Sequence, residues 1–122
     1  MKITSFNPLI VSPKAEDAIA LFEALGFERR HQKTGINGDI TSVAMKNADG
    51  FQVNVAQVDK VPQDMTLIRM NVDDFDEAYA FLTARGFRNA QGDSVTDTGT
   101  SRATMMVSPS GFAINLAQHI KA

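Results

Sequence analysis

The chain contains an internal repeat, and this repeat limits its possible folds more than any other feature of the sequence. The stretch MKNADGFQVNVAQV in the middle of the chain recurs near the C-terminus as MVSPSGFAINLAQH. Both stretches have a polar turn, Gly-Phe, an alternating run with one Asn, and Ala-Gln. Asn54 recurs as Asn115 with an offset of 61 residues, whereas ALFEALGF recurs as AFLTARGF with an offset of 60. Because insertions concentrate in connections between elements, this one-residue change predicts two copies of one structural module.

The first copy has the pattern of one strand, one helix and three further strands. The run ITSFNPLIV at 3–11 is rich in β-branched and aromatic residues, which favours a strand. Ser12 and Pro13 are typical of the N-cap and first position of a helix, and Gly26 is typical of a helix end. The runs that follow, up to FQVNVAQV, alternate apolar and polar residues between turns and predict strands.

The second copy repeats this order. TLIRMNV predicts the first strand, and Asp73 is the expected N-cap of a helix at 74–85. A weakly patterned stretch near 88–95 is the expected second strand, and the last two strands are SRATMMV and FAINLAQHI. The polar segment DKVPQDM joins the copies, as expected at a module boundary. We therefore predict a single α+β domain at 1–122, with an N-terminal βαβββ module at 1–58 and a C-terminal βαβββ module at 65–122.

Composition excludes several classes of function. The chain has no cysteine, which rules out disulfides, thiolate nucleophiles and cysteine-based metal sites. A net charge of −2 provides no basic surface, so we expect neither nucleic acid nor an anionic membrane as a partner. No apolar run approaches the roughly 20 residues of a membrane span. We expect a cytoplasmic protein.

The order of elements, with Gly-Phe after each helix and Asp-Gly or Ser-Gly before each last strand, resembles the vicinal oxygen chelate superfamily. This superfamily includes glyoxalase I, the extradiol dioxygenases and the bleomycin-resistance proteins. The alternative, a tandem pair of ferredoxin-like units, would not place two successive hairpin strands after each helix. The resemblance implies a cupped, half-barrel mixed sheet with helices outside, a ligand in the concave groove between the modules, and a homodimer.

The resemblance also gives the positions at which metal-dependent relatives hold their ion. They lie on the first and last strands of each module and correspond here to Phe6, Asn54, Leu67 and Asn115. Phe and Leu donate nothing to a metal, and neutral amides are poor substitutes for carboxylate or imidazole ligands. His31 and His119 fall outside these positions. We therefore expect no metal site, no cofactor and no metal-dependent glyoxalase or dioxygenase chemistry.

Strand alternation suggests which side chains line the groove. We expect Gln52 and Asn54 to point inward, Phe6, Pro8 and Ile10 to share one wall, and Leu67, Arg69 and Asn71 to share the other. The candidate ligand-binding residues are Phe6, Gln52, Asn54, Leu67, Arg69 and Asn115.

Arg69 is the most informative candidate because its strand neighbours are apolar. Its guanidinium suits a carboxylate or phosphate, and the alternative is that it pairs with an acid or reaches water at the rim. For Asn54 and Asn115 the alternative is a structural amide that bonds across the module interface.

Two classes of function remain open. The first is a binding protein of the bleomycin-resistance type, which holds a small anionic or aromatic molecule by shape and stacking. The second is a glyoxalase- or dioxygenase-like enzyme acting on a small anionic substrate. An enzyme needs a general base, and the groove positions offer none, so binding is favoured and no catalytic residue is nominated. The fold alone does not identify the ligand.

Overall fold

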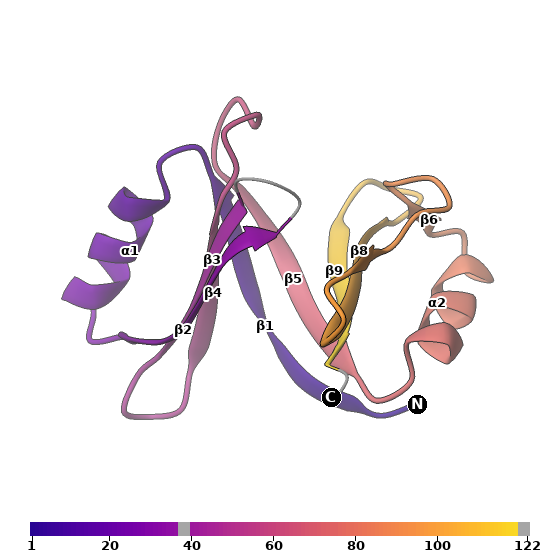
Figure 1. The fold of residues 1–122 in the computed structure, drawn as a ribbon, viewed down its shortest axis with the longest axis horizontal. Helices are drawn as coiled ribbons and strands as arrows, with labels where there is room; N and C mark the ends of the chain where they lie inside the picture. Colours follow the sequence, from indigo (N-terminus) through magenta and orange to yellow (C-terminus); the bar gives the residue numbers. More distant parts are fainter. Residues whose placement is uncertain (37–39, 120–122) are drawn as a thin grey trace. The chain divides into compact units, whose positions relative to one another are not determined.

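The computed structural model describes residues 1–36 and 40–119, which form two helices and nine strands (Figure 1). In chain order these are β1 (Ile3–Ser12), α1 (Ala15–Ala24), β2 (Glu28–Ile36), β3 (Ile40–Lys46), β4 (Gln52–Gln57), β5 (Met65–Val72), α2 (Phe75–Thr83), β6 (Arg88–Asn89), β7 (Thr96–Asp97), β8 (Ser101–Val107) and β9 (Ala113–His119). The predicted α+β fold of two repeated modules is confirmed. No helix among the described residues is long and apolar enough to cross a membrane.

Contacts between residues divide the chain into two compact units. The N-terminal unit consists of residues 7–66, and the C-terminal unit consists of residues 67–122 together with residues 1–6. The first residues of β1 therefore lie with the second copy of the repeat rather than with the first.

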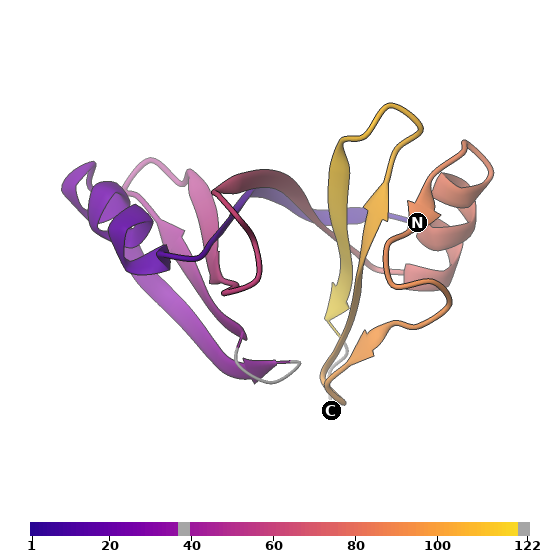
Figure 2. The same cartoon turned by 90° about the horizontal axis from the view of Figure 1, so that it is seen from above.

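In the N-terminal unit the strand order is β2-β3-β4-β1, with β1 parallel to β4 and the other pairs antiparallel. Helix α1 covers one face of this sheet (Figure 2). Its apolar stripe packs on the alternate side chains of the strands that point toward it. This core contains Ala15, Ile19, Val43, Met45, Val53 and Val55, with Ile10, Ala18, Phe22 and Phe27 packed against it.

In the C-terminal unit the strand order is β5-β9-β8-β6, with β7 also paired to β8. The weakly patterned stretch before β8 forms two short strands, β6 and β7, separated by turns, instead of one continuous strand. Helix α2 covers one face of the sheet, as α1 does in the other unit (Figure 2). The core contains Met70, Val72, Phe75, Ala78, Leu82, Met106, Ile114 and Leu116.

The repeated Ala-Gln has a structural role, because each Gln holds the start of a helix. Gln57 accepts a hydrogen bond from the Ala15 amide at 2.8 Å and donates to the Pro13 carbonyl at 2.6 Å. Gln118 accepts from the Phe75 amide at 2.8 Å and donates to the Asp73 carbonyl at 2.9 Å. Each glutamine thereby satisfies a backbone amide at the first helical turn, which has no partner within the helix.

Both helices begin later than the sequence predicts. The N-cap of α1 is Lys14, which makes no side-chain cap, and Ser12 Oγ instead accepts from the Lys14 amide. The N-cap of α2 is Asp74, whose carboxylate accepts from the Glu77 amide. Prediction failed here because Ser, Asp and Pro are compatible with several neighbouring positions in a turn.

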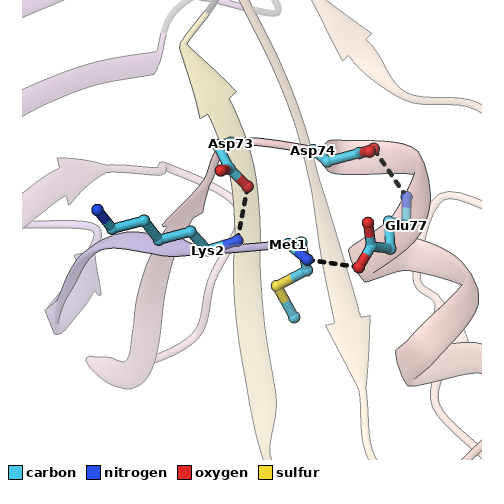
Figure 3. Close-up of polar contacts among 5 residues, drawn as sticks. All are labelled: Met1, Lys2, Asp73, Asp74 and Glu77. Carbon is cyan, nitrogen blue, oxygen red and sulfur yellow. Dashed lines mark hydrogen bonds and ion pairs between the residues drawn. The ribbon is translucent and has the colours of Figure 1, made fainter.

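The first two residues bind the start of α2 within the C-terminal unit (Figure 3). The Lys2 amide donates to the Asp73 carboxylate at 2.6 Å, and the Asp73 amide donates to the Lys2 carbonyl at 3.0 Å. The α-ammonium of Met1 forms an ion pair with Glu77. The pKa of this ammonium is raised, chiefly by its hydrogen bond to Glu77.

Candidate functional site

Each sheet has one face that its own helix does not cover, and we call this the helix-free face. In the C-terminal unit, Met70, Ile114 and Leu116 point toward α2, so the alternate residues of β5, β9 and β8 point to the helix-free face. These residues are Leu67, Arg69 and Asn71 on β5, Ala113, Asn115, Ala117 and His119 on β9, and Ser101, Ala103, Met105 and Val107 on β8.

Arg69 on β5 lies directly beside Asn115 on β9, which lies beside Met105 on β8. Its side chain is half-buried, and burial lowers the pKa of its guanidinium. No hydrogen bond or ion pair joins the guanidinium of Arg69 to any other residue in the ranges 1–36 and 40–119. By contrast, Arg102 on the opposite face pairs with Asp76 at 3.2 Å and lies over the Phe75 ring. Arg69 is therefore a partly desolvated cation whose side-chain donors are not used by the described part of the chain.

Asn115 differs from Asn54 in its surroundings although both occupy the same place in the repeat. The Asn115 side chain is half-buried and makes no hydrogen bond to the part of the chain that the structure describes. Asn54 is buried, and its Oδ1 accepts a hydrogen bond from Asn7 Nδ2 at 2.7 Å. Asn54 is thus a structural amide bonded within its own unit, whereas the amide of Asn115 is open.

The Asn7–Asn54 bond corrects the predicted register of the first strand. Leu9 lies opposite Asn54 on β4, and Arg69 lies opposite Asn115 on β9. The first strands of the two copies are therefore offset by 60 residues rather than 61, so the position equivalent to Leu67 is Asn7 and not Phe6.

This register also changes which residues of β1 point to the helix-free face. Ile10 packs against the α1 core instead of lining the helix-free face, where Leu9 stands. The Phe6 side chain is 62% exposed and belongs to the C-terminal unit, whereas Asn54 belongs to the N-terminal unit.

The remaining candidates lie on the predicted side of their strands. Leu67, Arg69 and Asn115 share the helix-free face of the C-terminal unit, with Leu67 buried. Gln52 is exposed and shares the helix-free face of the N-terminal unit with Asn54, opposite Lys46 on β3. The ligand-binding role of these residues stays a prediction.

Two histidines occupy positions that sequence reasoning did not assign to these faces. A register shift between Arg29 and His31 places His31 opposite Ala44, which is itself opposite Asn54. His119 lies on the same side of β9 as Asn115, at the end of the strand. Both are exposed, and no group of three or more His, Cys, Asp or Glu side chains within the described residues could hold a metal ion. The alternation of β9 could have revealed His119, whereas the bulge in β2 has no sequence signal.

The fold resembles that of solved proteins. A methylmalonyl-CoA epimerase is 23% identical over 94% of each chain, with a TM-score of 0.70. The methylmalonyl-CoA epimerase of Mycobacterium tuberculosis is 15% identical, over 98% of this chain and 90% of that one, with a TM-score of 0.74. A glyoxalase/bleomycin resistance protein/dioxygenase superfamily member from Vibrio splendidus 12B01 is 16% identical, over 96% and 99%, with a TM-score of 0.62.

No protein-family model and no curated protein matches the sequence. The structural matches confirm the expected fold of the vicinal oxygen chelate superfamily. At these identities they show the fold alone, because one fold supports many functions.

Proposed function

We propose that the protein binds a small molecule with an anionic group, a carboxylate or a phosphate, on the helix-free face of the C-terminal unit. The observation that carries this proposal is the half-buried guanidinium of Arg69, which has no partner among the described residues. Taking a charge out of water is unfavourable unless an opposite charge or hydrogen bonds compensate for it. A bound anion would supply this compensation.

The surroundings of Arg69 suit a small organic anion better than a metal. Asn115 beside it offers a neutral amide, and Met105 and Leu67 provide apolar surface. Small-molecule sites commonly combine apolar walls with a few placed polar groups. Two of the structural relatives are named as epimerases of methylmalonyl-CoA, which is itself an anion, and this supports an anionic ligand.

The test compares Arg69 with an exposed arginine of the same unit. Charged hydrogen bonds contribute roughly 1.5–3 kcal/mol, so Arg69→Ala should weaken binding of an anion about tenfold or more. Arg69→Lys should recover only part, because it loses the planar fork of donors. Arg88→Ala on β6 removes the same charge from an exposed site and should leave affinity nearly unchanged.

Thermal-shift screening of small carboxylates, phosphates and methylmalonyl-CoA would find the ligands, and calorimetry on the variants would measure affinities. We expect binding to survive treatment with EDTA. Equal losses in Arg69→Ala and Arg88→Ala would show that only net charge matters and would refute the proposal.

An enzymatic role on the same face is the second candidate, favoured by the position of His119. An imidazole can accept and donate a proton, which the other side chains of this face do not offer. If methylmalonyl-CoA binds, incorporation of deuterium from heavy water into it would show proton transfer, and His119→Gln should abolish it. Binding without exchange would leave the protein a binder only.

A further inference from the structure

A second polar group without a partner lies next to Arg69 on β5. Asn71 follows Arg69 by two residues, so both side chains point to the helix-free face of the C-terminal unit. The Asn71 Oδ1 atom is buried and accepts no hydrogen bond from the described residues. Buried polar atoms without partners are rare in folded proteins, and each one calls for a physical explanation.

The neighbours of Asn71 across β9 and β8 provide no donor, and Arg69, two residues before it, makes no hydrogen bond to its Oδ1 atom. The neighbour of Asn71 on β9 is Ala117, and the next residue in the same row is Ala103 on β8. Neither alanine has a polar side chain. Both end at Cβ, so a ligand group that approaches Asn71 meets less bulk here than beside Asn115 and Met105. The missing donor can therefore come from a bound molecule.

We propose that Asn71 accepts a hydrogen bond from the same ligand whose anionic group Arg69 holds. The inference rests on the proposed function and narrows the ligand class. Arginine only donates and the Asn71 oxygen only accepts, so the ligand must present an acceptor to one and a donor to the other. Residues two apart on a strand are separated by about 7 Å, a span that one small molecule can bridge with help from the long arginine side chain. The fitting class is a carboxylate or phosphate that carries a hydroxyl or amino group, such as a hydroxy acid.

The first test needs no ligand. Asn71→Leu keeps the approximate size of the side chain and removes the unsatisfied oxygen, so it should raise Tm by about 4 °C or more. Asn115→Leu is the matched control on the neighbouring strand, and it should give no such gain because no buried unsatisfied atom is removed. A lower Tm for Asn71→Leu would show that the amide already has a partner, such as water, and would overturn the inference.

The second test uses pairs of compounds that differ in a hydroxyl group. Calorimetry would compare succinate with malate, and propyl phosphate with 2-hydroxypropyl phosphate, which also separates carboxylates from phosphates. In at least one of the two pairs, the wild type should bind the compound with the hydroxyl group about tenfold more tightly than the compound without it. Asn71→Leu should abolish this preference and keep the affinity for the member without the hydroxyl.

The outcomes separate this inference from the proposal on which it rests. Binding that depends on Arg69 but shows no preference for a hydroxyl overturns the role of Asn71 alone. If Asn71→Leu weakens the binding of both compounds of a pair equally, the role of Asn71 is also overturned, because an equal loss indicates a structural effect. If none of the four compounds binds, the role of Asn71 in holding a hydroxylated anion fails. If Arg69→Ala has no effect on the binding of an anion, both proposals fail.

Discussion

The start of α1 should depend more strongly on Gln57 than the start of α2 depends on Gln118. The N-cap of α1 makes no side-chain hydrogen bond to the helix, whereas Asp74 caps α2 through the Glu77 amide. Helix α1 therefore relies on a glutamine from β4 for a contact that most helices obtain from their own N-cap residue.

The structure gives the expected magnitudes. Gln57 makes two partly buried hydrogen bonds, to the Ala15 amide and the Pro13 carbonyl, and an exposed one to Asp59. Gln118 makes one partly buried bond, to the Phe75 amide, and one exposed bond. At about 1 kcal/mol for each partly buried bond and little for an exposed one, Gln57→Ala should lower the free energy of unfolding by about 2 kcal/mol and Gln118→Ala by about 1 kcal/mol.

Urea unfolding followed by circular dichroism would measure both changes. Gln57→Glu is an informative control, since its carboxylate can still accept from the Ala15 amide and suits a helix N-terminus. It cannot donate to the Pro13 carbonyl or to Asp59, and its second oxygen would face both of these acceptors, so the loss in Gln57→Glu should be at least as large as that in Gln57→Ala. A loss in Gln118→Ala equal to or larger than that in Gln57→Ala would refute the reasoning.

Two further predictions concern the turns and the first residue. Gly86→Ala should lower the free energy of unfolding, measured in urea, by about 3 kcal/mol, and Gly26→Ala should lower it by about 1–2 kcal/mol. Both glycines have a positive φ, but only at Gly86 would an added Cβ approach Pro109, to 2.8 Å. The raised pKa of the Met1 α-ammonium means that the ion pair with Glu77 stabilises the fold below about pH 8, its ordinary value, and that this contribution is lost as pH rises through the raised pKa. Wild type should therefore lose more stability than Glu77→Gln between about pH 7 and 10, and parallel pH profiles would contradict this.

Much of the fold is predictable because burial imposes a period on the sequence. Apolar residues recur every three to four positions in the helices and at every second position in the last strand of each copy, because one side of each element packs on a core. The stretch that contains β6 and β7 is mostly exposed, so it has no such pattern and its two short strands could not be foreseen.

The candidate site was only partly predictable. Arg69 stands out in the sequence because a cation between Ile68 and Met70 must lie on the face opposite a core. The place of Asn7 could not be read in the same way, because a one-residue shift in β1 depends on pairing with β4. The unsatisfied oxygen of Asn71 depends on the alanines across the sheet, which no local pattern reveals.

The assignment of residues 1–6 to the C-terminal unit has a consequence for the order of folding. The N-terminal unit is one continuous segment, so it can fold as soon as residues 7–66 have been synthesised. The C-terminal unit cannot be completed in this way, because the hydrogen bond from Lys2 to Asp73 closes a separation of 71 residues. Such distant contacts form late, since the entropy of closing the loop must be overcome first. Residues 1–6 therefore leave the ribosome well before the residues that they bind in the C-terminal unit, and a fragment that starts at residue 65 would lack them altogether.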